Sequence, residues 1–341
     1  MKAAVITDSG GPDVIEIRDG VPRPEVGPGD VLVKVAACAV NHTDIWVRRG
    51  VTDGIPPIIP GLDIAGEVAE TGANVSSVRE GERVVVYPII ACRECEFCTK
   101  GDPSMCVDYG AIGESRDGGH AEYVTVPATN ILSLPDSVSF TAAAAAPSSF
   151  GTAWRALMTR GNLTLDDDVL VVGASGCVGH AAVQIAANAG ARVLACTSTD
   201  EKATRLRDLG ADHTIDYTAG DIDAEVKELT DGRGVDLAVE SVGGDVYKQA
   251  AKSLARGSRL VTFGATTGDA DEAMLQHIFW KQLEVVGSTG DTPYEFQQVM
   301  ERVFSDELTP VVDSQIPLSD LADAHERLEN RGVFGKIIVK L

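Results

Sequence analysis

Long apolar runs are missing from this sequence of 341 residues. No stretch approaches the roughly 18 consecutive apolar residues that a membrane-spanning helix needs. The opening residues, MKAAVITDSG, also lack the charged start, the apolar stretch and the small-residue cleavage site of a secretory signal peptide. We therefore expect a cytoplasmic protein without a membrane partner, and at roughly 150 residues per domain its length suggests about two domains.

Basic residues are scarce. The sequence holds 29 Lys plus Arg, of which ten are Lys, against 51 Asp plus Glu, which gives a net charge of −22. Such a charge repels phosphate backbones and anionic membrane surfaces, which argues against nucleic-acid and membrane partners. The acidic residues are spread along the whole chain and fit a surface kept soluble in concentrated salt. We therefore expect a halophilic source, with an acidic mesophilic enzyme as the alternative.

Cysteines are few and unevenly placed. Four of the seven form the pattern Cys92-x2-Cys95-x2-Cys98-x7-Cys106, and the others stand alone. An odd number with this distribution indicates metal binding and free thiols in a reducing compartment. Four thiolates from one short loop suit a tetrahedral zinc ion with no open position, which is a structural site. An iron–sulfur cluster and free thiols are the alternatives.

The character of the chain changes near its middle. Short β-rich runs separated by glycine and proline predict an all-β opening at residues 3–6, 13–18, 31–37, 66–70, 83–87 and 122–126. Residues 134–147 then supply a Ser or Thr N-cap and an alanine-rich helix start. From Asp168 onward, apolar runs alternate with amphipathic helical stretches. This alternation is typical of an α/β fold with a doubly wound parallel sheet.

A glycine-rich turn joins the first strand of that repeat to its helix. The turn reads GASGCVG over residues 173–179. Small residues let a backbone approach a pyrophosphate, which the free N–H groups of the helix then hold. We therefore expect dinucleotide binding at Ser175, Gly176, Cys177 and Val178, although a tight turn without a ligand has the same composition.

The end of the next strand bears on which dinucleotide is bound. A carboxylate there would bind the adenosine ribose and repel a 2′-phosphate. Here the chain reads Thr197, Ser198, Thr199, with Lys202 close behind, which favours NADPH. Asp200 and Glu201 follow at once and could reach the ribose instead.

Together, these motifs and the closing AHERLENRGVFGKIIV resemble the medium-chain dehydrogenase/reductase superfamily over essentially the full chain. The resemblance implies a GroES-like catalytic domain at residues 1–128 and 291–341, with the zinc lobe at 92–106. It implies a Rossmann dinucleotide-binding domain at residues 129–290.

Zinc alcohol dehydrogenases of this superfamily hold a second, catalytic zinc, whose ligands this sequence lacks. Asn41 in AVNHTD stands where the resemblance requires a thiolate, and Leu62 in GLDIAG stands where it requires an imidazole. The third ligand would come from residues 142–154, which contain no Cys, His, Asp or Glu. His42 and Asp63 then become hydrogen-bonded groups that orient the cleft, with a makeshift metal site as the alternative.

With those losses, VNHTDIWVRRG and PGLDIAG are similar to the quinone oxidoreductase branch, although many of its members lack the four-cysteine lobe. The resemblance assigns the substrate cleft to Asn41, Asp44, Trp46 and Arg48, and the nearby hydroxyl of Thr43 is a candidate proton donor. It assigns the adenosine 2′-phosphate to Ser198, Lys202, Tyr217 and Arg331. It assigns the nicotinamide surroundings to Thr152, Phe263 and Gly264.

These observations predict an NADPH-dependent reductase of conjugated acceptors, meaning an enone, an enoyl thioester or a quinone. Such small electrophiles delocalise the incoming charge themselves, helped by hydrogen bonds from Asn41 or a backbone amide and by a proton from water or Thr43. The alternatives are an alcohol or polyol dehydrogenase with a remodelled zinc site and a non-catalytic NADPH-binding protein. The apolar run 283–289 suggests a strand that pairs subunits of a homodimer or homotetramer, although a buried interior strand would look the same.

Overall fold

The computed structural model describes residues 1–52 and 54–341, which form two compact units. The first unit comprises Met1–Ser148 and Asp291–Leu341, and the second comprises Ser149–Gly290. The sequence places the first boundary at residue 128, but residues 129–148 belong to the first unit. The reason is tertiary, because strand β9 (Ile131–Ser133) pairs with β5 (Arg83–Val86) of that unit.

The first unit is built on a seven-stranded sheet with the order β16-β17-β3-β4-β5-β9, in which β8 also pairs with β3. Alternate valines of β3 and β8 are buried in one apolar cluster. The bounds of the other strands in this sheet are β3 (Asp30–Ala39), β4 (Asp63–Thr71), β8 (Tyr123–Pro127), β16 (Val312–Pro317) and β17 (Lys336–Lys340).

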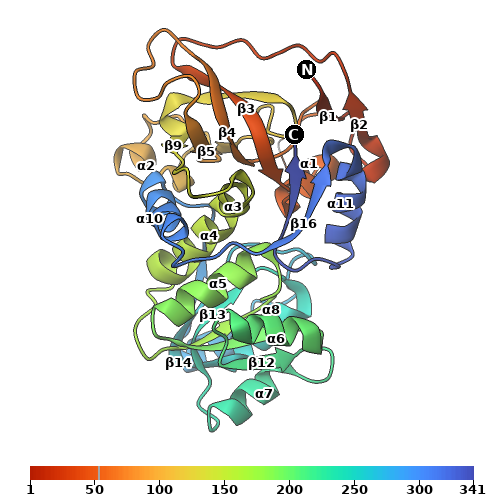
Figure 1. Ribbon diagram of the computed structural model, residues 1–341. Coiled ribbons are helices and arrows are strands. Elements are labelled where there is room, and N and C mark those ends of the chain that lie inside the picture. Colours follow the sequence, from red (N-terminus) through yellow and green to blue (C-terminus); the bar gives the residue numbers. More distant parts are fainter. Residues whose placement is uncertain (53) are drawn as a thin grey trace. The chain divides into compact units, whose positions relative to one another are not determined.

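Smaller elements complete the first unit, and Figure 1 draws them in red to yellow and in blue. As predicted, the alanine-rich helix starts after a serine N-cap, since Ser139 accepts a hydrogen bond from the N–H of Ala142. The elements are β1 (Ala3–Ile6), β2 (Ile15–Arg18), β6 (Ile89–Ile90), β7 (Gly110–Ala111), α1 (His42–Arg49), α2 (Glu96–Thr99), α3 (Phe140–Ala145), α10 (Pro293–Phe304) and α11 (Leu321–Glu329).

Register within the sheet brings three chain segments together at one end. Ala39, the last residue of β3, lies opposite Asp63, the first residue of β4. Ala39 also lies opposite Ile338 of β17, whose first residue is Lys336. The polar residues that flank these strand ends are therefore neighbours in space, although they are far apart in the sequence.

The second unit is a six-stranded parallel sheet with the order β12-β11-β10-β13-β14-β15, which confirms the doubly wound α/β class. Helix α4 (Pro147–Trp154) leads into it through a π-helical segment, Arg155–Arg160. The other elements, drawn mostly in green to light blue in Figure 1, are β10 (Asp168–Val171), α5 (Cys177–Asn188), β11 (Arg192–Thr197), α6 (Asp200–Asp208), β12 (His213–Asp216), α7 (Ile222–Leu229), β13 (Val235–Glu240), α8 (Gly244–Ser253), β14 (Leu254–Thr262), α9 (Leu275–Lys281) and β15 (Glu284–Gly287).

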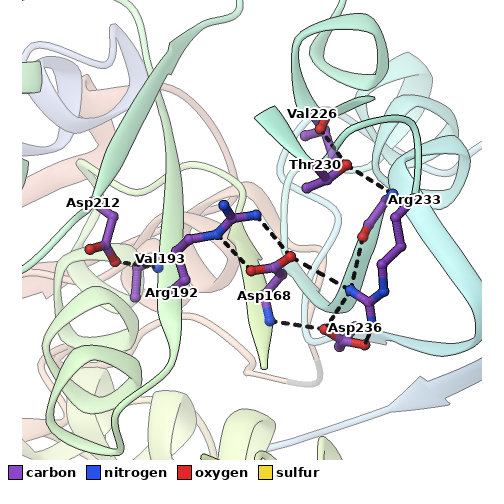
Figure 2. Close-up of polar contacts among 9 residues, drawn as sticks. Asp168, Arg192, Val193, Asp212, Val226, Thr230, Arg233 and Asp236 are labelled. Carbon is purple, nitrogen blue, oxygen red and sulfur yellow. Dashed lines mark hydrogen bonds and ion pairs between the residues drawn. The ribbon is translucent and has the colours of Figure 1, made fainter. Parts of the chain in front are cut away.

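Ion pairs connect the central strands of this sheet at their amino ends (Figure 2). Asp168 at the start of β10 accepts two hydrogen bonds from Arg192 of β11, at 2.7 and 2.9 Å. Arg233 lies 3.5 Å from Asp168 and also pairs with Asp236 of β13. These bonds connect three strands at one end, and the opposite, carboxyl end carries the glycine-rich turn.

Strand β15 lies at the edge of the sheet, and most of its residues are exposed. The interpretation of residues 283–289 as a buried interior strand is therefore wrong. Among the helices that the structure describes, none is long and apolar enough to cross a membrane.

Candidate functional site

A buried polar cluster lies where β3, β4 and β17 of the first unit converge. The Lys336 ammonium donates to Asp63 Oδ2 at 2.9 Å and also to Asn41 Oδ1. Asn41 Nδ2 donates to the same Asp63 oxygen at 3.1 Å. Lys336 is 1% exposed and Asp63 is 0% exposed, so this ion pair is withdrawn from solvent.

Ser148 from the start of α4 completes the cluster. Its backbone N–H donates to Asp63 Oδ1 at 2.9 Å, and its hydroxyl lies 2.5 Å from Asp63 Oδ2 and 3.0 Å from Asn41 Oδ1. Lys336 Nζ donates to the same hydroxyl at 3.3 Å. Ser148 is half-buried, whereas the other three side chains are buried.

Sequence reasoning missed both Ser148 and Lys336. Ser148 falls inside the segment 142–154, which holds no Cys, His, Asp or Glu and therefore gives no metal-binding signal. Lys336 opens the strand KIIVK directly before three apolar residues, and a lysine in that position was the signal that could have found it. Charged residues are rarely fully buried unless they are paired, so such a lysine calls for a partner.

The role that the sequence suggests for the Asn41 amide needs correction. Besides Asp63, Asn41 Nδ2 donates to the carbonyl oxygen of Ala39 at 3.3 Å. An amide has two N–H donors, and both are used inside the protein. Asn41 therefore has no N–H left for a substrate oxygen in this arrangement.

Helix α1 carries the remaining residues assigned to the cleft. Asp44 is buried and accepts from the backbone N–H of Asn41 at 2.7 Å and of Gly61 at 2.8 Å. Burial raises the pKa of Asp44 to about 7, although these hydrogen bonds oppose the shift. Arg48 is also buried and pairs with Glu329 of α11 at 2.5 Å. Asp44 thus connects α1 to the backbone at Gly61, and Arg48 connects it to α11.

The other side chains of α1 are more accessible. Thr43 and Trp46 are half-buried, and the ring of Trp46 lies 6.4 Å from that of His42. Burial lowers the pKa of His42, and the charge of Lys336 adds to this effect. His42 does not join Asp63 in a three-ligand metal site among the described residues.

The donor set around Asp63 does not fit a catalytic zinc ion. Asn41 and Ser148 offer neutral oxygens in place of thiolates, and Leu62 is a buried hydrocarbon. The Asp63 carboxylate already binds the Lys336 ammonium, whose charge repels a second cation.

The four-cysteine lobe does fit a metal. The Sγ atoms of Cys92, Cys95, Cys98 and Cys106 all lie within 4.8 Å of one another, and this is the sole such cluster found in the described part of the chain. Backbone N–H groups of Cys95 and Asp108 point at the Sγ atoms of Cys92 and Cys106, at 3.4 and 3.3 Å. Such bonds stabilise thiolates, and four thiolates suit a structural zinc ion.

Local backbone geometry explains how the lobe gathers its sulfurs. Arg93, between the first two cysteines, has a φ of 66°, which turns the chain back on itself. Its guanidinium donates to Asn130 Oδ1 at 2.9 Å. The amide of Asn130 in turn donates to the carbonyl oxygens of Tyr87 and Ile89, both at 2.8 Å, so the lobe is tied to the strands before it.

In the second unit, the glycine-rich turn has the geometry that a dinucleotide site needs. Gly173 has a φ of 64°, and a Cβ on Gly179 would lie 2.2 Å from the Gly173 carbonyl oxygen, so helix and strand pack closely. Gly176 is exposed and is the N-cap of the twelve-residue helix α5. The first N–H groups of that helix have no carbonyl partner within the helix, which fits the binding of a pyrophosphate.

Of the residues assigned to the adenosine 2′-phosphate, three lie in the second unit and one lies in the first. Ser198, Lys202 and Tyr217 gather at the carboxyl ends of β11 and β12, where Tyr217 N donates to Thr197 O at 3.3 Å. Arg331 lies in the first unit, exposed just after α11, with a φ of 57°.

The residues assigned to the nicotinamide all lie in the second unit. Phe263 and Gly264 follow β14, and the Phe263 N–H donates to the carbonyl oxygen of Glu240 at the end of β13, at 3.1 Å. Thr152 is half-buried on α4.

Comparisons with known proteins match both units. Residues 27–136 match the model of the alcohol dehydrogenase GroES-like domain, and residues 177–305 match that of zinc-binding dehydrogenases. The chain is 31% identical to a quinone oxidoreductase-like protein 2 homolog of Nematostella vectensis over 99% of this chain and 88% of that protein. The chain belongs to the medium-chain dehydrogenase/reductase superfamily.

The proteins that are similar to this chain carry names for different activities. An acryloyl-coenzyme A reductase of Sulfurisphaera tokodaii is 27% identical, with full coverage of both chains. The crystal structure of an NAD-dependent alcohol dehydrogenase is 38% identical, covers 100% of both chains and superposes with a TM-score of 0.96. These matches confirm the superfamily, the fold and an oxidoreductase of this superfamily. The similar proteins are named as a reductase in one case and as an alcohol dehydrogenase in the other.

Proposed function

We propose that this protein is an NADPH-dependent reductase of conjugated acceptors that works without a catalytic metal. The observation that carries the proposal is the buried Lys336 ammonium, bonded to Asp63, Asn41 and Ser148. This cluster contains Asn41, which stands where zinc alcohol dehydrogenases of the superfamily require a metal-binding thiolate. A fixed ammonium in this place supplies positive charge without an open coordination position.

The charge balance of the cluster favours an acceptor that spreads its own negative charge. Reduction of a simple ketone concentrates charge on one oxygen, which a zinc ion stabilises in many enzymes. The Lys336 charge is largely offset by Asp63 at 2.9 Å, so its field on a substrate is weaker than that of a divalent metal. An enone, an enoyl thioester or a quinone delocalises the charge and needs less help. Two of the relatives, named for quinone and acryloyl-thioester chemistry, support this class.

The second unit carries the residues that would hold NADPH. The cofactor supplies a hydride when bound. The glycine-rich turn and the N-terminus of α5 would bind its pyrophosphate. Ser198, Lys202 and Tyr217 would bind the 2′-phosphate, since β11 ends in hydroxyl side chains where an NAD-specific site carries a carboxylate.

We expect the purified protein to oxidise NADPH with at least one conjugated acceptor from a panel of crotonyl thioester, enone, quinone and aldehyde. A 2′-phosphate contact of ordinary strength makes kcat/KM for NADPH about tenfold or more above that for NADH. Steady-state absorbance measurements give both values. Lys202→Ala should reduce this preference, and Lys227→Ala, an exposed lysine of α7, should leave it unchanged.

Metal analysis separates this function from that of a zinc alcohol dehydrogenase. The proposal requires one zinc ion per chain, held by the cysteine lobe. Two zinc ions per chain, together with chelator-sensitive oxidation of simple alcohols and no turnover of the conjugated acceptors, would refute it. Tight binding of NADPH without turnover of any acceptor would favour a non-catalytic binding protein.

We also infer that the protein forms homodimers or homotetramers through the β15 edge. Val285 of this strand is 42% exposed, and Phe279 and Trp280 of the neighbouring α9 are 67% and 68% exposed. Unpaired strand edges beside apolar side chains are prone to pair with a second copy. Light scattering should give a mass of two or four chains, and Val285→Arg should lower it. A monomeric wild type would contradict this inference.

A further inference from the structure

We propose that Ser148 donates the proton that completes the reduction and that Lys336 restores it. This inference deepens the proposed function and rests on it. Within the cluster, Ser148 alone is half-buried, whereas Asn41, Asp63 and Lys336 are buried. The serine hydroxyl is therefore the group through which the buried ammonium can reach a substrate.

Asp63 fixes the position of this hydroxyl. One carboxylate oxygen accepts the backbone N–H of Ser148 at 2.9 Å, and the other accepts its hydroxyl at 2.5 Å. Both the backbone and the side chain of Ser148 are thus held by a single buried group. The bond from the Ser148 N–H holds the backbone at this position, so only the hydroxyl has to turn when the reaction occurs.

Lys336 favours the deprotonated form of the hydroxyl once that hydroxyl has turned away from Asp63, whose carboxylate otherwise opposes it. Its ammonium donates to Ser148 Oγ at 3.3 Å and therefore stabilises negative charge on that oxygen. The same N–H lies on the line along which a proton would return to an alkoxide. Ser148 thus has both a stabilising charge and a proton source in one neighbour.

The proton transfer balances as follows. Hydride addition to the β-carbon breaks the π bond of the acceptor and leaves an enolate. The Ser148 O–H bond then breaks, and its proton forms a C–H bond at the α-carbon, or an O–H bond in the case of a quinone. The Ser148 alkoxide takes a proton from Lys336 Nζ, and a proton from water then returns to the buried amine through the half-buried Ser148 hydroxyl before the next turnover.

Donation to a substrate requires the hydroxyl to turn away from Asp63. The carboxylate keeps its other partners when this happens, because Lys336 and the Asn41 amide still donate to Oδ2 and the Ser148 N–H still donates to Oδ1. The rotation therefore leaves no buried charge without a partner, which would be the costly outcome.

Variants of Ser148 in the full-length protein test this role, with the best acceptor of the panel as substrate. Ser148→Ala should lower kcat about a hundredfold or more while KM stays within about threefold, since general acids contribute at this scale. Ser148→Thr keeps a hydroxyl and should stay within about tenfold of wild type. Ser133→Ala removes an exposed hydroxyl from β9 and should leave kcat unchanged.

Solvent isotope effects distinguish a proton donor from a structural serine. Wild type and Ser148→Thr should both turn over about twofold or more slowly in D2O. A Ser148→Ala enzyme within about twofold of the wild-type kcat would overturn the proposal. So would a Ser148→Thr enzyme without an isotope effect, which decides the matter even if Ser148→Ala does not fold.

Failure of this inference can be told from failure of the proposed function. If the wild type reduces only aldehydes or ketones, the proposed function fails, and the Ser148 variants are then compared on those substrates. If the wild type reduces conjugated acceptors and Ser148→Ala does so equally well, the inference alone fails.

Discussion

Replacement of Cys95 by serine will release the bound zinc ion and unfold the lobe at residues 92–106. The lobe has little else to hold it, since its sequence RECEFCTKGDPSM is mostly polar and its helix α2 spans only Glu96–Thr99. Structural zinc contributes on the order of 10 kcal/mol or more to the ordering of such segments. The loss should appear as faster hydrogen exchange and faster proteolysis confined to the lobe.

The same experiment identifies the metal. Atomic absorption should give one zinc ion per chain in the wild type and none in Cys95→Ser, whereas Cys177→Ser in the second unit should keep its full zinc content. A visible absorption band with bound iron would show an iron–sulfur cluster instead. Metal-free protein whose lobe resists protease as well as the wild type would contradict a structural role for zinc.

Replacement of Lys336 by methionine should destabilise the first unit strongly. The substitution leaves the Asp63 carboxylate buried at 0% exposure without its counter-ion. Removal of one partner from a buried ion pair costs about 3–5 kcal/mol, because the remaining charge has lost both its solvent and its partner. Unfolding in urea, followed by tryptophan fluorescence, measures the change in the free energy of unfolding.

Two companion variants isolate the buried charge as the cause. Lys340→Met lies on the same strand but changes an exposed lysine, so its effect should stay within about 0.5 kcal/mol. The double variant Asp63→Asn/Lys336→Met removes both charges and should recover part of the lost stability, since paired residues are not additive. A loss for Lys336→Met no larger than that for Lys340→Met would show that the ion pair is unimportant for stability.

The parts of the site that the sequence could predict depend on residues close together in the chain. Two motifs are of this kind: the glycine-rich turn with the helix after it, and the four cysteines of the lobe. In each, the residues are separated by only a few positions, and such a spacing fixes their geometry once the local secondary structure is known. The structure accordingly places the four Sγ atoms together, within 4.8 Å. It also places Gly176 at the N-cap of α5.

The buried cluster could not be predicted in this way. Lys336 lies 273 positions after Asp63, and Ser148 lies 85 positions after it. Sequence patterns carry no information on contacts at such distances. The sequence alone could show that Asn41 and Leu62 bind zinc poorly, and the structure shows that Lys336 and Ser148 are bonded to Asp63.

The sequence by itself determined the class of each domain, the glycine-rich turn before a helix and the four-cysteine lobe, because each follows from periodicity or spacing along a continuous segment. Tertiary structure alone decided the boundary at Ser148, the exposed edge at β15 and the partners of the buried lysine. Those features depend on which strands pair and in which register, and strand register brings residues from distant segments together through the packing of the whole unit.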